Sequence, residues 1–241
     1  MLEKYKSTLI NFEFQQGNEN LIVFLHGWGT KIQLMKPLGN FFENYSKLYI
    51  DFPPFGDSST PNEPFTLDDY VKITENIINK ISGDDITNIF LIGHSFGGRV
   101  AIKIASTDFP VSKLILLSSA GLKNTSLKTK YLITKYKLLK KFNAKKIVNM
   151  GSSDYLSLSP VMKKTFVNIV NEDLSNCCKN IKIPTILIYG NKDKETPPKM
   201  AKKFKKLIHL SKLFMIDGAD HFCYLNRIYE VVPIIKTFLE I

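Results

Sequence analysis

Residues 89–98 read Ile-Phe-Leu-Ile-Gly-His-Ser-Phe-Gly-Gly, an apolar run followed at once by a turn rich in glycine. The run at 89–92 has the length and composition of a strand buried on both faces, and a helical pattern begins at Phe96. A Gly-x-Ser-x-Gly turn between a strand and a helix is typical of a nucleophile elbow, because flanking glycines permit the strained backbone that exposes a serine hydroxyl. The pattern predicts that Ser95 is a nucleophile; a glycine-rich turn without chemistry is the alternative.

Segments of the same kinds alternate on both sides of this motif, and the alternation indicates the fold class. An α/β fold with a mostly parallel central sheet flanked by helices produces this pattern. Short apolar runs predict strands at 21–25, 48–50, 114–117, 185–189 and 212–216, and an alternating stretch predicts an edge strand at 7–14. Helical patterns occupy residues 67–81, 96–106, 197–208 and 224–239.

Residues 120–182 interrupt this alternation, since they carry helical patterns but no strand signal. Two strand–helix units do not need so many residues, and long insertions between the elements of a sheet are usually functional. We therefore predict a helical cap, or lid, at 120–182, inserted into one core formed by residues 1–119 and 183–241.

Residues 26–29 read His-Gly-Trp-Gly and follow the strand predicted at 21–25. With this segment added to the serine turn, the sequence resembles the α/β-hydrolase superfamily over nearly its whole length. The resemblance implies the α/β-hydrolase fold, an oxyanion hole formed by the backbone N–H groups of Trp28 and Phe96, and no need for a metal or organic cofactor. It also implies that His26 is structural. A tight turn with a packed tryptophan is the alternative for this segment.

Two further residues complete a candidate catalytic triad with Ser95. His221 follows the strand predicted at 212–216, and Asp193 follows the one at 185–189. Active sites of parallel sheets gather at the carboxyl ends of the strands, so these side chains are expected at the same edge as Ser95. The chain order of serine, acid and histidine is that of an α/β-hydrolase. Other carboxylates that remain alternatives for the acid are Glu195, Asp217 and Asp220.

A serine nucleophile restricts the expected chemistry to acyl transfer. Members of the resembled superfamily that open epoxides or remove halogens use aspartate at the elbow. We therefore expect a serine hydrolase that cleaves a carboxylic ester or thioester of a small-molecule acyl substrate through an acyl-enzyme intermediate, as in EC class 3.1. The alternatives are a C–C bond hydrolase of ring-cleavage-type diketones and a non-catalytic ligand-binding homologue.

The net charge of +11 is distributed unevenly along the chain. Residues 120–182 carry 13 lysines against 3 acidic residues, a net charge of +10, so the predicted cap holds nearly all of the excess. Only 2 of the 33 basic residues are arginines, which argues against a nucleic-acid reader. The basic amphipathic stretch at 123–146 is most simply a solvated lysine face over the cleft; steering of anionic substrates or peripheral contact with anionic lipid is the less favoured alternative.

The cysteines and the N-terminal residues bear on the compartment. Cys177 and Cys178 are adjacent and Cys223 stands alone, so neither a disulfide framework nor a metal-binding spacing is predicted. No secretory signal is visible, and no stretch approaches the roughly 18 apolar residues that a membrane-spanning helix needs. We expect a cytoplasmic monomer or homodimer.

Overall fold

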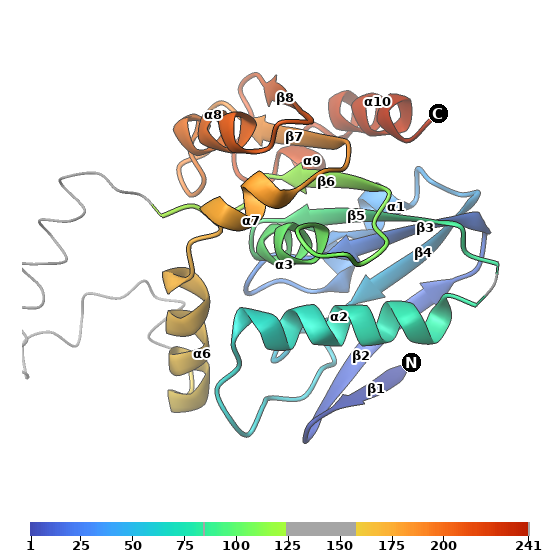
Figure 1. The fold of residues 1–241 in the computed structure, drawn as a ribbon, viewed down its shortest axis with the longest axis vertical. Coiled ribbons are helices and arrows are strands. Elements are labelled where there is room, and N and C mark those ends of the chain that lie inside the picture. Colours follow the sequence, from blue (N-terminus) through green and yellow to red (C-terminus); the bar gives the residue numbers. More distant parts are fainter. Residues whose placement is uncertain (84, 124–157, 241) are drawn as a thin grey trace, which may run out of the picture.

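The computed structural model describes residues 1–83, 85–123 and 158–240, and in these residues the chain forms one eight-stranded sheet with helices on both faces (Figure 1). The strands are β1 (Leu2–Tyr5), β2 (Thr8–Gln15), β3 (Asn18–Leu25), β4 (Tyr45–Ile50), β5 (Asn88–His94), β6 (Lys113–Leu117), β7 (Thr185–Gly190) and β8 (Ser211–Ile216). Their order across the sheet is β1-β2-β4-β3-β5-β6-β7-β8. Pairing is antiparallel from β1 through β2 to β4 and parallel from β4 to β8, which confirms the predicted α/β fold with a mostly parallel sheet.

Two hydrophobic cores lie on the two faces of the sheet, because successive side chains of a strand point to opposite faces. In β3, Leu21, Val23 and Leu25 belong to one core, and Ile22 and Phe24 to the other. The first core is covered by α2 (Leu67–Ile81), α3 (Phe96–Ala105), α7 (Ser175–Asn180) and α8 (Pro198–Leu207). The second is covered by the 3-10 turn η1 (Ile32–Leu34) and by α1 (Lys36–Gly39), α9 (Cys223–Asn226) and α10 (Ile228–Leu239).

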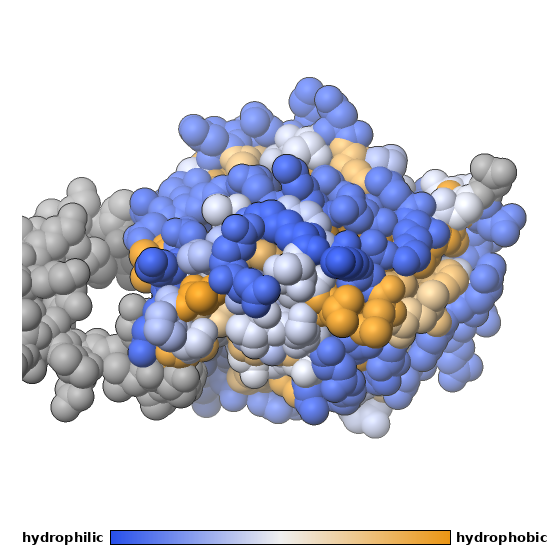
Figure 2. All heavy atoms as spheres, turned by 90° about the horizontal axis from the view of Figure 1, so that it is seen from below, coloured by the Kyte–Doolittle hydropathy of each residue, from blue (hydrophilic) through white to orange (hydrophobic). Residues whose placement is uncertain are grey.

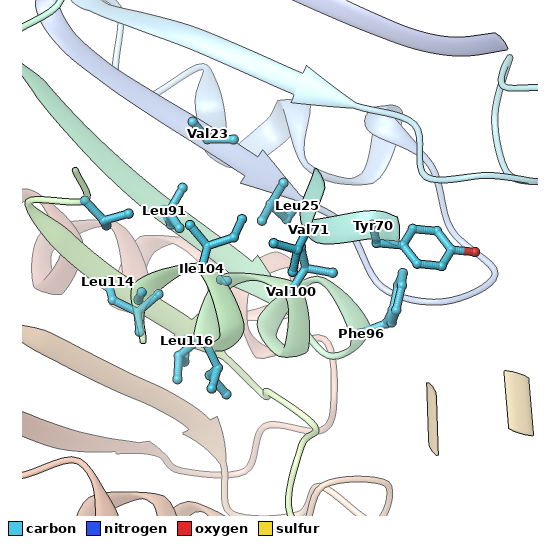
Figure 3. Packing of buried hydrophobic residues seen from close by; sticks show 14 of the residues in the cluster. Val23, Leu25, Tyr70, Val71, Leu91, Phe96, Val100, Ile104, Leu114 and Leu116 are labelled. Carbon is cyan, nitrogen blue, oxygen red and sulfur yellow. The ribbon is translucent and has the colours of Figure 1, made fainter. Parts of the chain in front are cut away.

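Helix α3 lies across the middle of the sheet and holds the serine turn in place. Figure 3 shows Val100 and Ile104 of α3 among Leu25, Leu91 and Leu116, which come from β3, β5 and β6. All five side chains are fully buried. Burying side chains of this size contributes about 1.5–3 kcal/mol each, so α3 is anchored firmly against the central strands of the sheet.

The predicted strands and helices are confirmed, with differences at both ends of the chain. The sequence does not predict β1, whose four residues are too few to show a pattern; β1 pairs with β2 through Leu2 opposite Asn11. The helical pattern at 224–239 divides into α9 and α10, because the backbone of Arg227 (φ −131°, ψ 40°) leaves the helical region between them.

The structure describes only part of the predicted cap, namely residues 120–123 and 158–182. These include α6 (Pro160–Asn171) and α7. Leu122, Leu174, Cys178 and Ile181 belong to the same core as α3, so this part of the segment packs directly on the body of the molecule. The insertion of 120–182 as a separate unit stays a prediction, and the basic stretch at 123–146 lies outside the described residues after Lys123.

Helix α6 is attached to the body by polar contacts in its middle and just beyond its C-terminal end. Thr165 Oγ1 accepts a hydrogen bond from the N–H of Phe65 (2.9 Å), and Asn168 Nδ2 donates to the Phe65 carbonyl (3.2 Å). Arg99 of α3, itself buried, donates to the carbonyl of Glu172 just beyond the helix (3.0 Å). These bonds place α6 beside the carboxyl end of the sheet (Figure 1).

Across residues 1–83, 85–123 and 158–240, none of the helices is long and apolar enough to span a membrane. On the face seen in Figure 2, hydrophilic residues cover most of the area and apolar residues form patches between them.

Candidate active site

Ser95 occupies the strained turn between β5 and α3. Its φ of 49° and ψ of −106° lie in a region that costs a residue with a side chain about 1–3 kcal/mol. Two backbone hydrogen bonds hold this conformation, from Ser95 N–H to the Leu117 carbonyl and from Ala120 N–H to the Ser95 carbonyl, both 3.1 Å. The turn leaves the Ser95 side chain half-buried at the N-terminus of α3, where the helix dipole favours developing negative charge.

The glycines around Ser95 are required by close backbone contacts. A Cβ on Gly93 would lie 2.6 Å from the Gly97 carbonyl oxygen, and one on Gly97 would overlap the Leu25 carbonyl at the end of β3. A Cβ on Gly98 would overlap Ser119 Oγ. The Gly-x-Ser-x-Gly-Gly pattern therefore reflects three places where α3 and the ends of the strands leave no room for a side chain.

His221 and Asp193 form a buried hydrogen-bonded pair. The distance from His221 Nδ1 to Asp193 Oδ2 is 2.9 Å, and the two side chains are 7% and 0% exposed. Burial acts to raise the pKa of Asp193, but hydrogen bonds from His221 and Thr196 outweigh it and hold this pKa below the usual range for a carboxyl group. Asp193 is therefore a carboxylate, and it fixes the proton of the imidazole on Nδ1 and leaves Nε2 as the basic nitrogen.

Thr196 supports this pair and was not predicted from the sequence. Its N–H donates to Asp193 Oδ1 (2.8 Å), and its hydroxyl lies 2.7 Å from Asp193 Oδ2 and 3.0 Å from the Ser118 carbonyl oxygen. The N–H of Glu195 also donates to Asp193 Oδ1 (2.8 Å). An Asp-x-x-Thr sequence after a buried strand is the signal that could have indicated this side-chain capped turn.

His94 connects the serine turn to His221. Its Nε2 lies 3.2 Å from the His221 carbonyl oxygen, and the two rings are 4.9 Å apart. Burial, together with the neighbouring His221, lowers the pKa of His94 to about 3. The ring is therefore neutral and donates its Nε2 proton to that carbonyl. This contact places the loop of His221 directly beside Ser95.

The three predicted triad residues are brought to one edge of the sheet, but only two of them are hydrogen-bonded to each other. Within the described residues, Ser95 Oγ makes no hydrogen bond with His221, whose Nε2 lies 3.2 Å from Glu195 Oε2. Hydrogen bonds between catalytic groups are often long before substrate binds. The hydrogen bond between His221 and Asp193 is thus formed, and one between Ser95 and His221 is not.

None of the other candidate carboxylates contacts His221 Nδ1. Asp217 Oδ1 accepts from Asn191 Nδ2 (2.5 Å), and Asp220 Oδ1 accepts from Asn226 Nδ2 (3.0 Å). Glu195 lies on the opposite nitrogen of the imidazole from Asp193. Of these candidates, Asp193 is thus the carboxylate placed on Nδ1.

The loop after β3 lies against the serine turn. A Cβ on Gly27 would be 3.5 Å from Ser95 Cβ, and the ring of Trp28 packs edge-on against that of Phe96 at 5.5 Å. In the described parts of the chain, the backbone N–H groups of Trp28 and Phe96 have no hydrogen-bond acceptor. Two free donors beside a serine hydroxyl are what an oxyanion requires.

His26 is excluded as a general base by its own hydrogen bonds. Its Nε2 accepts from the N–H of Phe52 (2.8 Å), and its Nδ1 lies 2.7 Å from the Gly27 carbonyl oxygen. Burial lowers the pKa of His26 to about 4, so the ring is neutral and donates from Nδ1. Both nitrogens are committed to the backbone, which agrees with the structural role implied by the resemblance.

An aromatic wall borders the site next to the nucleophile. The ring of Trp28 contacts those of Phe55 (5.0 Å), Phe96 (5.5 Å) and Phe166 (5.3 Å). Phe166 comes from α6, so a helix of the predicted cap contributes directly to this wall. No cluster of three or more histidine, cysteine or acidic side chains suited to a metal ion occurs in residues 1–83, 85–123 and 158–240.

Comparisons with known proteins agree with this architecture. A model of the alpha/beta hydrolase family matches residues 22–144. A pimeloyl-(acyl-carrier protein) methyl ester esterase of Wigglesworthia glossinidia brevipalpis is 31% identical, with 93% of this chain and 95% of the relative covered. Solved structures include an esterase (EaEST) from Exiguobacterium antarcticum (TM-score 0.77, 20% identity, 97% and 96% covered) and MenH from S. aureus (TM-score 0.73, 26% identity, 95% and 97% covered).

Proposed function

The chain belongs to the α/β-hydrolase family, and on this basis we propose that it is a serine hydrolase that cleaves carboxylic ester bonds through an acyl-enzyme intermediate. The observation that carries the proposal is the buried Asp193–His221 pair, 2.9 Å long, on the loop that His94 ties to the strained Ser95 turn. A pair of this kind that only stabilised the fold would not need a strained serine beside it. The combination of an ionised carboxylate, an imidazole and a serine held in a strained turn is typical of a catalytic site.

In the proposed mechanism, His221 Nε2 takes the proton of Ser95 as the serine oxygen attacks the ester carbonyl. Asp193 keeps the imidazole in the correct tautomer and stabilises the imidazolium. The N–H groups of Trp28 and Phe96 stabilise the oxyanion, and removing one such donor typically costs about 3–4 kcal/mol. His221 then protonates the leaving alcohol, and a water molecule repeats the sequence on the acyl-enzyme. None of these steps needs a cofactor.

The aromatic wall of Trp28, Phe55, Phe96 and Phe166 supports an apolar acyl group next to Ser95. The name of the esterase relative described above makes the methyl ester of an acyl-carrier-protein-bound pimeloyl group the first substrate to examine. Mass spectrometry of the carrier protein would detect loss of the methyl group and so identify that activity. A thioester of the same acyl chain is the control that shows whether the enzyme cleaves oxygen esters, thioesters or both.

We further propose that the enzyme acts in the cytoplasm on a small acyl substrate, as a monomer or homodimer without a nucleic-acid partner, and that residues 120–182 form its cap. Separation of oligomers by size with light scattering would test the assembly state. The described part of this segment contributes Phe166 to the wall of the site, which supports a role for it in substrate access.

The decisive experiment uses a fluorophosphonate probe and a series of p-nitrophenyl esters. Ser95→Ala should lose labelling and reduce kcat by at least about 10³-fold, as removal of a triad nucleophile does. Ser106→Ala is the matched control, because Ser106 lies just beyond the other end of α3; it should label and hydrolyse like the wild type. Undiminished turnover by Ser95→Ala would exclude this mechanism, and turnover of a vinylogous diketone without ester cleavage would favour the C–C hydrolase.

A further inference from the structure

The imidazole of His221 lies between two carboxylates of different character. Asp193 Oδ2 is 2.9 Å from Nδ1, and the Asp193 side chain is fully buried. Glu195 Oε2 is 3.2 Å from Nε2, and the Glu195 side chain is 69% exposed. The proposed mechanism uses the Asp193 carboxylate and gives no role to that of Glu195.

The backbone of Glu195 is fixed while its carboxylate can move. Its N–H donates to Asp193 Oδ1 (2.8 Å), so the chain at this point belongs to the turn that holds the acid. Within the described residues, the Glu195 carboxylate forms no ion pair with a lysine or arginine, the flanking Lys192 and Lys194 included; the basic group beside it is the His221 ring, which carries a charge only when it is protonated. The negative charge of Glu195, which lies next to His221 Nε2, is thus neither neutralised by a lysine nor buried.

The nitrogen that Glu195 contacts is the one that must deliver a proton to the leaving group. Whatever group leaves from the tetrahedral intermediate must bring its oxygen within hydrogen-bond distance of His221 Nε2. Glu195 therefore stands where the alcohol part of an ester has to lie, and its exposed side chain can swing aside to admit it. The negative charge remains within a few ångströms of that alcohol.

From this geometry we propose that Glu195 is a specificity-determining residue of the leaving-group site, which favours esters of cationic alcohols and disfavours esters of anionic ones. The inference rests on the proposed serine hydrolase function and deepens it. A unit charge at about 6 Å across a partly solvated site changes the relative rate by roughly five- to tenfold.

The test compares three butyrate esters whose alcohols share a two-carbon link to a branched head group and differ in the charge of that group. Butyrylcholine is cationic, 3,3-dimethylbutyl butyrate is its neutral isostere, and the butyrate ester of 2-hydroxyethanesulfonate is anionic. The wild type should hydrolyse them with kcat/KM falling in that order, with about five- to tenfold between neighbours. Salt at about 0.5 M should reduce the differences in kcat/KM among the three esters, because the Debye length falls to a few ångströms.

Glu195→Gln keeps the backbone donor and the side-chain shape but removes the charge, so the three kcat/KM values should converge to within about twofold. Glu230→Gln, an exposed residue of α10 paired with Arg227, makes the same change in net charge away from the site and should retain the wild-type order. Unchanged ratios in Glu195→Gln would overturn this inference while leaving the hydrolase intact. If the wild type cleaves p-nitrophenyl esters but none of these three, the inference is wrong and the proposed function stands; if it cleaves no ester of either series, the proposed function itself is overturned.

Discussion

Thr196 shows how a single hydroxyl positions the candidate acid. It lies 2.7 Å from Asp193 Oδ2 and 3.0 Å from the Ser118 carbonyl, so it links the loop after β7 to the end of β6. Thr196→Val removes this link without changing the size of the side chain. Since a hydrogen bond to a charged group is worth about 1.5–3 kcal/mol, we expect kcat for a p-nitrophenyl ester to fall about tenfold or more, with little change in KM.

Thr196→Ser retains the hydroxyl and serves as the rescue control for this prediction. Its kcat should stay within about threefold of the wild type. Equal losses in the valine and serine variants would mean that Thr196 acts by packing rather than by its hydrogen bond to Asp193.

At the scale of elements, the junction of β5 and α3 depends on backbone contact with β3. Gly97 lies against the Leu25 carbonyl, and the His26 carbonyl oxygen is 2.8 Å from the position of its missing Cβ. Neither atom can give way, because both are backbone atoms, one in the last residue of the central strand β3 and the other in the residue that follows it. Gly97→Ala should lower the free energy of unfolding by about 1–3 kcal/mol, and it should reduce activity by displacing the N–H of Phe96.

Gly83→Ala provides the comparison at a helix end. A Cβ on Gly83, just after α2, meets no atom within 4 Å, so this change should leave stability within about 1 kcal/mol of the wild type or raise it slightly. Urea unfolding of both variants measures the difference. If Gly97→Ala proves as stable as Gly83→Ala, the close approach of α3 to β3 does not require a glycine at position 97.

At the scale of the whole molecule, two fully buried histidines make folding sensitive to acid. His26 and His94 are neutral in the folded protein, with pKa values lowered by burial to about 4 and about 3. In the unfolded chain each binds a proton near pH 6.5. Below that pH the unfolded state therefore holds more protons, and the free energy of unfolding decreases as the pH falls toward the folded pKa values.

Each of these histidines should cost about 2 kcal/mol of stability between pH 7 and pH 5, since one pKa unit corresponds to 1.36 kcal/mol. Urea unfolding at pH 7, 6 and 5 measures the sum. A variant that replaces one of them, such as His94→Asn, should show a shallower dependence by about one proton at pH 5. A free energy of unfolding that stays constant over this interval would contradict the assignment of both rings as buried and neutral.

Most of the sheet was predictable because its strands are buried on both faces. Runs such as 89–92 and 114–117 are apolar throughout, a pattern that water-exposed segments do not sustain. The edge strand β1 was missed because half of its side chains face solvent and its stability comes from pairing with β2. The break between α9 and α10 was missed as well, since Arg227 carries no signal of its own for a non-helical backbone.

The amino-acid sequence alone was enough to predict the α/β class, the tight turn at Ser95 and the position of Asp193 and His221 at the same edge of the sheet, because glycine spacing and strand ends are local properties. It could not reveal that Thr196 hydrogen-bonds to Asp193, or that Glu195 lies 3.2 Å from His221 Nε2 while Ser95 forms no hydrogen bond with that nitrogen. Those relations join residues through the packing of β6, β7 and β8, and side-chain distances across neighbouring strands are set by the fold as a whole.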